Sequence, residues 1–359
     1  MKRLAIVNHN LGSGGAEKLI YDMAIELQKR EIDFSVILLT SVNCIYGKRL
    51  LEKGIDVIYL SDRWDIYSPK NIFRLIRVLK NYDVIHTHIY SAQLWTALAS
   101  LYLDKKRIYI TTEHNTSNNR RGKSVFKVLD KIMYSRYEKI VSINKETELS
   151  LKNWIGDYEK KGKVIENGID IESILNFKER TRKELGFKEE DILLCQIARL
   201  NIVKNHETSF KTLKELPQKY KLILLGEGER KDELLRLAGQ LEISNRVYFL
   251  GYRDDVYGVL KAMDISLLTS QYEGLPISCL ESMLLVPFIG SRVPGIKEVV
   301  AGYGELFELN NHLELKDLIL KVVEDRELYE KLKRECNKRA TEYSIKKCVD
   351  KYIEVYEGR

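Results

Sequence analysis

Two carboxylates flank the start of a predicted helix that follows an apolar run of the sequence. Glu273 lies in the segment 272–276, and Glu281 follows with seven residues between them. Because Pro276 suits the first turn of a helix, we expect Glu273 in the loop before that helix and Glu281 inside it. Two carboxylates at these depths can address the hydroxyl groups of one ligand. The alternative is a loop charge beside an ordinary helix-surface glutamate.

Two cations follow an earlier apolar run, 192–197. Arg199 and Lys204 are five residues apart in what the pattern predicts to be a strand-to-helix loop, so they can converge on one dianion. Gly226 and Gly228 follow the next apolar run in the same way. Glycines at such a place let a backbone approach a neighbour or a ligand closely.

A glycine-rich segment follows the first apolar run of the chain. Gly14 and Gly15 open a predicted helix, where backbone N–H groups attract anions. The spacing is neither the dinucleotide Gly-x-Gly-x-x-Gly nor the phosphate loop of NTPases, which ends in Lys-Ser or Lys-Thr. A plain tight turn is the alternative.

Polar side chains also close two further runs in the first half. His86 and His88 alternate, so both imidazoles share one face of a strand. Because no third ligand is near, we expect them to line a cleft rather than hold zinc. The fifth run ends in Glu113-His114-Asn115. A basic stretch follows it, and it includes Arg120, Arg121, Lys123, Lys127 and Lys131.

The elements that must position these residues alternate between short Ile, Val and Leu runs and longer segments of 3.6 periodicity. This alternating pattern is typical of a parallel, doubly wound α/β sheet, and it begins again after residue 180. The sequence therefore predicts an N-terminal domain over 1–166, a linker over 167–179, a C-terminal domain over 180–341 and a C-terminal helix over 342–359. Ligands of such sheets bind outside the carboxyl ends of the strands, where the residues above are expected.

Charge is unevenly distributed over the 359 residues, whose net charge is +7. Residues 1–165 hold 28 Lys and Arg against 18 Asp and Glu, and residues 166–359 hold 31 against 34. The basic half predicts an anionic partner, among which nucleic acid ranks lowest because no aromatic-basic interleaving accompanies the charge. The five cysteines lack a Cys-x-x-Cys pair, and no apolar run is long enough to span a membrane. With no signal peptide recognisable, we expect a cytoplasmic protein.

Taken together, the order and spacing of these motifs resemble the retaining glycosyltransferases of family 4, in particular those of bacterial surface-polysaccharide synthesis. The resemblance covers nearly the whole chain and is most specific at Glu273–Glu281, which matches the family's Glu-x7-Glu motif. Support comes from Gly14-Gly15-Ala16-Glu17, from Arg199 with Lys204, and from Gly226-Glu227-Gly228. The resemblance implies the GT-B architecture, in which two Rossmann-like domains face each other across a deep interdomain cleft.

The same resemblance implies a nucleotide-sugar donor, with a UDP-sugar favoured, and a glycan or lipid-linked acceptor on the first domain. Arg199 and Lys204 would hold the diphosphate, Glu281 the ribose, and Glu273 the sugar. The implied donor contacts further include Gly14, Gly15, Gly226, Gly274 and Leu275, with His114 touching the donor sugar. The implied acceptor-side residues are His86, His88, Glu113, Asn115, Arg120 and Arg121. No Asp-x-Asp occurs, so we expect no metal cofactor.

Two stretches depart from the family pattern, and two other functions compete with transfer. Ser282–Pro287 is one residue short and lacks the usual glycine, and Arg292-Val293-Pro294-Gly295 replaces a more glycine-rich segment. A nucleotide-sugar 2-epimerase shares the architecture, and a non-catalytic nucleotide-sugar-binding protein would share the site. In addition, 125–136 combines an apolar stripe with basic residues. We therefore expect a peripheral enzyme at the inner face of the cell membrane, although the stripe could instead pack on the sheet.

Overall fold

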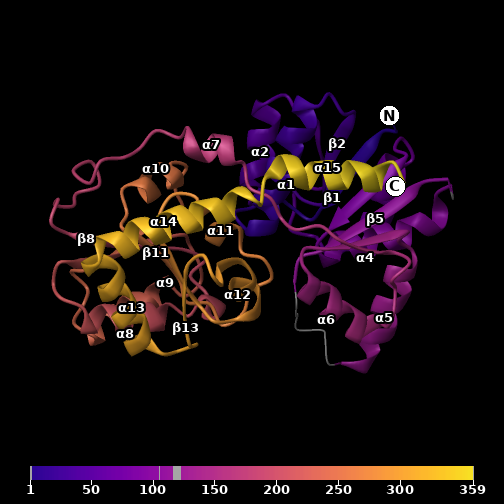
Figure 1. Cartoon of the computed structure of the whole chain (residues 1–359). Helices are drawn as coiled ribbons and strands as arrows, with labels where there is room; N and C mark the ends of the chain where they lie inside the picture. Colours follow the sequence, from indigo (N-terminus) through magenta and orange to yellow (C-terminus); the bar gives the residue numbers. More distant parts are fainter. Residues whose placement is uncertain (1, 105, 116–122, 359) are drawn as a thin grey trace. The chain divides into compact units, whose positions relative to one another are not determined.

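The computed structural model describes residues 2–104, 106–115 and 123–358 and divides the chain into two compact units. The first unit is Met1–Gly168 with Ile345–Arg359, and the second is Ile169–Ser344 (Figure 1). Each unit is built on one parallel sheet between layers of helices. The α/β fold class predicted from the alternation of short apolar runs and helical periods is confirmed.

The first unit holds a seven-stranded sheet in the order β3-β2-β1-β4-β5-β6-β7. Its strands are β1 Leu4–Asn8, β2 Phe34–Leu38, β3 Val57–Tyr59, β4 Val84–His88, β5 Ile108–Glu113, β6 Lys139–Ser142 and β7 Gly162–Val164. Its helices are α1 Gly15–Lys29, α2 Ile45–Glu52, α3 Lys70–Leu79, α4 Tyr90–Ala99, α5 Ser124–Ser135, α6 Lys145–Ile155, α15 Ile345–Tyr356 and the short 3-10 turn η1 Ser100–Tyr102.

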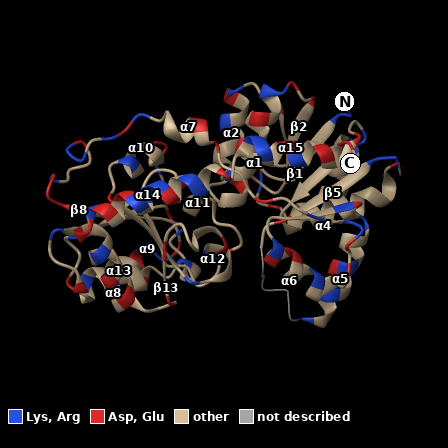
Figure 2. Cartoon of the chain, viewed as in Figure 1, with Lys and Arg blue, Asp and Glu red and all other residues tan. Residues whose placement is uncertain are grey.

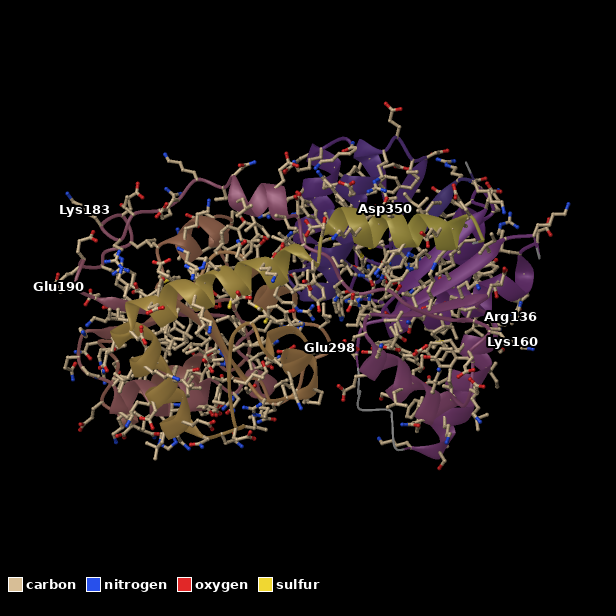
Figure 3. All side chains as sticks on the ribbon, in the orientation of Figure 1. Arg136, Lys160, Lys183, Glu190, Glu298 and Asp350 are labelled. Atoms are coloured by element: carbon tan, nitrogen blue, oxygen red, sulfur yellow. The ribbon has the colours of Figure 1, made fainter. Side chains whose placement is uncertain are left out.

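Helices cover both faces of this sheet. Right-handed crossovers place α1 and α2 on one face and α3 to α6 on the other, because the strand order reverses direction after β3. The C-terminal helix α15 packs on α1 (Figure 1). Arg30, the C-cap residue of α1, is ion-paired with Asp350 of α15 (Asp350 is labelled in Figure 3), and its Nη2 donates to the carbonyl of Lys346 at 3.0 Å. The chain thus returns from the second unit to complete the first.

The second unit holds a six-stranded sheet in the order β10-β9-β8-β11-β12-β13. Its strands are β8 Ile192–Ile197, β9 Tyr220–Leu225, β10 Val247–Gly251, β11 Ile265–Leu268, β12 Phe288–Ser291 and β13 Glu305–Phe307. Its helices are α7 Ile171–Leu175, η2 Ile202–Lys204, α8 His206–Glu215, α9 Lys231–Gln240, α10 Val256–Lys261, α11 Ile277–Met283, α12 Pro294–Val300, α13 His312–Glu324 and α14 Arg326–Thr341.

The segment expected as the linker 167–179 differs from that expectation. The division between the units falls after Gly168, and the residues that follow belong to the second unit. They are fixed there because Ile169 N–H donates to Tyr343 at 2.8 Å, while Nζ of Lys261 donates to the carbonyls of Leu175 and Phe177 at 2.6 and 2.7 Å. The segment is polar because it runs over the surface of the second unit, to which it is hydrogen-bonded, and not because it is a free linker.

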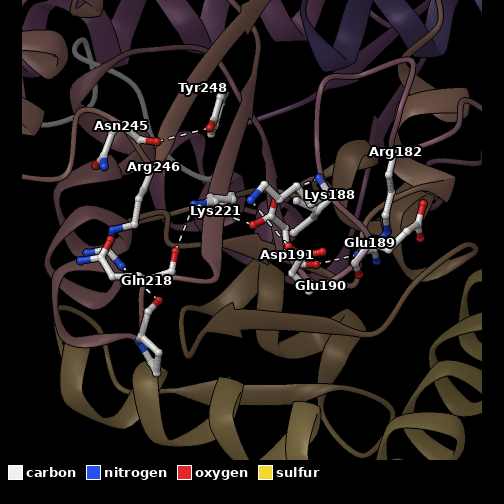
Figure 4. A network of polar contacts seen from close by, with 12 residues as sticks. Arg182, Lys188, Glu189, Glu190, Asp191, Gln218, Lys221, Asn245, Arg246 and Tyr248 are labelled. Carbon is white, nitrogen blue, oxygen red and sulfur yellow. Dashed lines mark hydrogen bonds and ion pairs between the residues drawn. The ribbon is translucent and has the colours of Figure 1, made fainter.

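A polar network fastens the chain where it enters the second sheet (Figure 4). The Nη1 atom of Arg182 donates to the carbonyl of Asp191 at 2.6 Å, and the Asp191 carboxylate accepts from the N–H of Lys188 at 3.0 Å. Nζ of Lys221 on β9 lies 3.8 Å from the same carboxylate. These contacts pin the start of β8, so that the opposite end of β8 meets the site described below in a fixed register.

Candidate functional site

The two loops that carry the predicted cations and glutamates lie side by side in the second unit. β8 and β11 are neighbours in the sheet, although the chain visits β9 and β10 between them. The loops after these two strands therefore leave in opposite directions, which is the switch point where open α/β sheets bind ligands. Lys204 follows β8 and Glu273 follows β11. The topology thus brings together two residues that are 69 positions apart.

Lys204 and Glu273 form a direct ion pair across this switch point. Nζ of Lys204 lies 2.5 Å from Oε1 of Glu273, and the hydroxyl of Ser270 donates to the same oxygen at 2.6 Å. The two charged side chains are only 18% and 12% exposed. The backbone beneath them is also fixed, because Oγ1 of Thr269 donates to the carbonyl of Lys204 at 3.0 Å. The ion pair is therefore nearly buried, and hydrogen bonds from neighbouring residues fix its position.

Arg199 is exposed on a loop that is clamped by its neighbours. The N–H of Leu200 donates to Glu227 at 3.0 Å, and the carbonyl of Leu200 accepts from Arg230 N–H at 3.0 Å. A Cβ at Gly226 would lie 2.2 Å from the carbonyl oxygen of Ala198, and one at Gly228 would lie 2.4 Å from that of Leu200. Both glycines are thus required by close backbone approach, which holds Arg199 beside the switch point.

Glu281 is buried within α11 and is held by a tyrosine that the sequence did not single out. The hydroxyl of Tyr257 on α10 donates to Oε1 of Glu281 at 2.5 Å. Glu281 is 7% exposed and Tyr257 is 8% exposed. No motif marks Tyr257, because its meeting with α11 depends on how two helices pack.

The glycine of the unusual segment 292–295 has a structural reason. A Cβ at Gly295 would lie 2.0 Å from the carbonyl oxygen of Gly274 and 2.5 Å from that of Glu273. The start of α12 therefore packs directly against the loop that carries Glu273, with Leu275 buried behind it. The departure from the family pattern keeps a glycine at the contact that positions this loop.

The shortened segment after Glu281 ends its helix without a glycine. The carbonyl of Ser282 accepts from the N–H groups of Leu285 and Val286, both at 3.0 Å. Nδ2 of Asn337 on α14 donates to the carbonyl of Leu284 at 2.7 Å. These bonds satisfy carbonyls that a C-terminal glycine motif would otherwise serve, so β12 begins directly at Phe288.

In the first unit the glycine-rich loop leads into α1. Gly14 is the N-cap and Gly15 the first helical residue. A Cβ at Gly14 would lie 2.2 Å from Oε2 of Glu17, whereas a Cβ at Gly15 would meet nothing within 4 Å. The Glu17 carboxylate therefore folds over the helix start, where a negative charge is stabilised by the exposed N–H groups. An anion that approaches Gly14 must displace this carboxylate or share the N–H groups of the helix start with it.

The expectation that His86 and His88 line a cleft is wrong for this structure. Both imidazoles are fully buried. Nδ1 of His86 lies 2.8 Å from the hydroxyl of Tyr356 and its Nε2 lies 2.8 Å from Oγ1 of Thr112, while Nδ1 of His88 lies 2.9 Å from Nε2 of His114. The strand alternation put them on one face correctly, but that face is covered by α15.

Burial keeps these imidazoles neutral. Desolvation lowers the pKa of His86 to about 3 and that of His114 to about 4. Burial also lowers the pKa of His88 far below its ordinary value, and the neighbouring imidazoles reinforce that shift. The cluster thus supplies hydrogen bonds near neutral pH, not positive charge.

A pocket of about 590 Å³ opens beside this cluster at the carboxyl ends of β4 and β5. Its polar lining includes three predicted residues, Glu113, His114 and Asn115. The Glu113 carboxylate accepts from the hydroxyl of Tyr134 at 2.5 Å and from Asn115 N–H at 3.2 Å. The apolar lining comprises Tyr67, Ile89, Tyr90, Leu94, Trp95 and Phe126. The predicted Arg120 and Arg121 lie outside the described residues.

Most of the apolar stripe of α5 does not pack on the sheet. Val125, Val128, Leu129 and Ile132 are exposed by 72%, 59%, 48% and 58%. Met133, which also belongs to the stripe, is buried in the core of the first unit, as is Tyr134 on the opposite side of the helix. Lys and Arg are interspersed along the same segment (Figure 2), and Arg136 at its end is exposed (Figure 3).

No cluster of three or more His, Cys, Asp or Glu side chains in the described ranges is arranged to hold a metal ion. Within those ranges, no helix has the length and apolar character needed to cross a membrane.

Comparison with known proteins agrees with this architecture. The structure superposes on that of the Anabaena protein HepE in complex with UDP and glucose with a TM-score of 0.88 and 20% identity, covering all of both chains. Sucrose-phosphate synthase from Thermosynechococcus elongatus gives a TM-score of 0.83 at 15% identity, covering 100% of this chain and 99% of the other. The fold is therefore GT-B.

Curated relatives cover most of the chain at low identity. The chain is 26% identical over 309 residues to the Escherichia coli UDP-Gal:alpha-D-GlcNAc-diphosphoundecaprenol alpha-1,3-galactosyltransferase, covering 81% of this chain and 80% of the relative. It is 23% identical over 361 residues to the N-acetylgalactosamine-N,N'-diacetylbacillosaminyl-diphospho-undecaprenol 4-alpha-N-acetylgalactosaminyltransferase of Campylobacter jejuni, covering 95% of each chain.

Two family models divide the chain between them. The model described as Glycosyltransferase Family 4 matches residues 13–173, and the model described as Glycosyl transferases group 1 matches residues 177–339. The first match contains the glycine-rich loop and the histidine cluster, and the second contains all of the switch-point residues. The chain belongs to the family-4 glycosyltransferases and is a transferase of sugar groups.

Proposed function

We propose that this glycosyltransferase moves a sugar, with retention of anomeric configuration, from a UDP-sugar to a lipid-linked acceptor in the synthesis of a surface polysaccharide. The activities after which the E. coli and C. jejuni relatives are named support the lipid-linked acceptor, and the name of the E. coli relative supports the UDP donor. The observation that carries the proposal is the meeting of Lys204 and Glu273 at the switch point of the second sheet, beside Arg199.

Arg199 and Lys204 bind the diphosphate of the donor in this proposal. Negative charge grows on the departing phosphate as the bond to the anomeric carbon breaks, and fixed cations stabilise that charge without reorganising. Removing one such donor costs on the order of 3–4 kcal/mol in the activation barrier. Two cations at the diphosphate can supply this role, so we propose that the reaction needs no metal ion.

The remaining donor contacts follow the family motif. Glu281, held by Tyr257, accepts hydrogen bonds from the ribose hydroxyls, and Glu273 with the backbone of Gly274 and Leu275 orients the sugar. The clamp of Gly226 on the Arg199 loop supports a positioning role for that glycine. Gly14 and Gly15 are also proposed as donor contacts. His114 contacts the donor sugar.

The acceptor hydroxyl attacks the anomeric carbon on the face that the leaving group vacates, and its proton passes to the departing phosphate. No covalent sugar-enzyme intermediate is formed. We assign the acceptor to the 590 Å³ pocket of the first unit. Aromatic and aliphatic walls suit the apolar face of a sugar or the start of a lipid, while Glu113 and Asn115 supply polar contacts. Arg120 and Arg121 are also proposed on the acceptor side.

The exposed face of α5 supports a peripheral position at the inner face of the cell membrane. Four exposed apolar side chains on a short helix with flanking lysines and arginines have the composition of an interfacial helix. Each cation near an anionic surface contributes about 1 kcal/mol. An enzyme bound to the membrane in this way would encounter a lipid-linked acceptor at the membrane surface.

Acceptor dependence of UDP release tests the proposed reaction against both competing functions. Transfer predicts that UDP appears rapidly only when a UDP-sugar and a polyprenyl-diphosphate-linked sugar are both present. A 2-epimerase would instead isomerise the UDP-sugar without acceptor, and a non-catalytic binding protein would bind it and leave it intact. Either of those outcomes over a panel of UDP-sugars contradicts the proposal.

A further inference from the structure

In the histidine cluster of the first unit, one fully buried imidazole nitrogen has no hydrogen-bond partner among the described residues. His86 uses both ring nitrogens, one on Tyr356 and one on Thr112, each at 2.8 Å. Its ring lies 4.1 Å from that of His88, centroid to centroid. His86 therefore packs against His88 but has no hydrogen bond to give it. His88 bonds only to His114 through Nδ1, and its Nε2 is buried and unpaired within the described residues.

One proton lies between His88 and His114, and burial decides where it sits. Both rings are neutral because burial lowers their pKa values. If His114 donated from Nε2, His88 would carry its own proton on the unpaired Nε2, leaving a buried N–H without an acceptor. If His88 donates from Nδ1, only a ring lone pair stays unpaired. Buried unpaired N–H groups are the rarer and costlier defect, so the second arrangement is favoured.

We propose that His88 is a positioning residue for transfer, because it fixes the tautomer and the orientation of His114. In this arrangement His114 accepts on Nε2 and carries its proton on Nδ1. Since Nε2 points inward at His88 and the ring lines the 590 Å³ pocket, the Nδ1–H edge is turned toward the pocket as a hydrogen-bond donor. The donor suits an oxygen of a bound sugar. This role rests on the proposed function for its catalytic consequence, but not for the tautomer itself.

A matched pair of substitutions separates this role from simple packing. An asparagine at position 88 can place an amide N–H where Nδ1–H of the imidazole lies, whereas a glutamine reaches toward the Nε2 position instead. Both are neutral amides of similar burial cost. We expect His88→Asn to keep most of the wild-type kcat and His88→Gln to lose about 10- to 100-fold, by analogy with partners that orient metal-binding histidines. The KM for the UDP-sugar should change little in both.

Nitrogen-15 NMR of histidine-labelled protein reads the tautomer without any activity. The six histidines are assigned by single substitutions. We expect the His114 ring to show a protonated Nδ1 in the wild type and in His88→Asn, and a mixture or a protonated Nε2 in His88→Gln. A protonated Nε2 in the wild type would overturn the proposal, as would a His114 pattern that ignores both substitutions.

The two readouts also separate this proposal from the proposed reaction. If the NMR pattern is as expected but no UDP-sugar and acceptor pair is turned over, the proposed function fails and the tautomer assignment stands. If the enzyme transfers sugar but His88→Asn and His88→Gln are equally impaired, His88 only packs the core and the positioning role is wrong. Should His88→Gln fail to fold, the wild-type and His88→Asn spectra and the kcat of His88→Asn still decide.

Discussion

The ammonium of Lys204 lies 2.5 Å from the carboxylate of Glu273, so the cation proposed for the diphosphate and the carboxylate proposed for the sugar already neutralise each other. The loops that carry them follow β8 and β11, which are neighbours in the sheet. A bound diphosphate must therefore share the ammonium of Lys204 with Glu273, or displace the Glu273 carboxylate from it. Donor binding and the position of Glu273 are coupled through this pair.

The first prediction concerns UDP alone. Glu273→Gln removes the competing charge, so we expect the affinity for UDP to rise by about 10-fold, which corresponds to about 1.4 kcal/mol, while transfer falls. Lys204→Ala should lower the affinity instead. Calorimetry with UDP measures both, and Asp317→Asn on α13 is the control for loss of a carboxylate in the same unit. An unchanged UDP affinity in Glu273→Gln would show that the pair does not compete with the ligand.

The second prediction concerns the hydroxyl of Tyr257. Tyr257→Phe leaves the Glu281 carboxylate without the donor that lies 2.5 Å away. A hydrogen bond to a charged group contributes about 1.5–3 kcal/mol, so we expect the KM for the UDP-sugar to rise about 10-fold or more. Tyr248→Phe is the matched control, because its hydroxyl only meets the carbonyl of Asn245 at 3.3 Å (Figure 4). Equal KM values in the two variants would contradict the proposed role of Tyr257.

The third prediction concerns Gly295. An alanine there must displace the loop of Glu273, because its Cβ would lie 2.0 Å from the Gly274 carbonyl. We expect Gly295→Ala to lower both the melting temperature and kcat. Gly239→Ala on α9 is the opposite case, since its Cβ meets only Ser244 at 3.9 Å and helical alanine is favoured over glycine by about 0.5–1 kcal/mol. The idea fails if Gly295→Ala is as active as Gly239→Ala.

The fourth prediction concerns pH. The folded-state pKa values of His86 and His114 are lowered to about 3 and about 4, so only the unfolded chain takes up these protons just below pH 6.5. The contribution of these buried, neutral histidines to the free energy of unfolding is therefore complete above pH 6.5. It is lost as the pH falls toward the folded pKa values. Between pH 7.5 and 5.5 each such histidine should cost about 1.4 kcal/mol of unfolding free energy.

Urea unfolding followed by tryptophan fluorescence can measure this in one unit. All three tryptophans, Trp64, Trp95 and Trp154, lie in the first unit, as the histidine cluster does. Replacing His86 by glutamine should reduce the pH dependence by the share of one histidine. A free energy that stays level from pH 7.5 to 5.5 would mean that the cluster is protonated or open in the folded protein.

The fifth prediction concerns the membrane. Val128→Asp with Ile132→Asp should abolish sedimentation with anionic vesicles at low salt, because it places charge on the exposed apolar face of α5. Leu313→Asp, at a site 49% exposed on α13, is the control. Wild-type protein that remains in the supernatant with anionic and neutral vesicles alike would refute the proposed membrane position.

The fold could be predicted in outline because buried parallel strands read as apolar runs. β8, expected over 192–197, has those bounds. α7, α12 and β13 were not predicted, since each is short and its place depends on partners far along the chain. The bond between Ile169 N–H and Tyr343 is an example, because it moves a polar segment expected as linker into the second unit.

The site was predictable where motif spacing carries it and not where packing decides. The loops of Lys204 and Glu273 were expected at strand ends, and the topology brings them together. The burial of His86 and His88 could not be read from alternation, because the covering helix α15 lies more than 250 residues away in sequence, as the contact of His86 with Tyr356 shows. Tyr257 carries no sequence signal for the same reason.

The anomeric configuration of the transferred sugar tests the central claim most directly. Wild-type protein is incubated with an isotope-labelled α-linked UDP-sugar and a polyprenyl-diphosphate-linked acceptor, and the new linkage is read by the coupling constant of its anomeric proton. The account predicts an α-linked product that depends on Arg199 and Lys204. A β-linked product, or label that never leaves the UDP-sugar for any acceptor of this class, would contradict it.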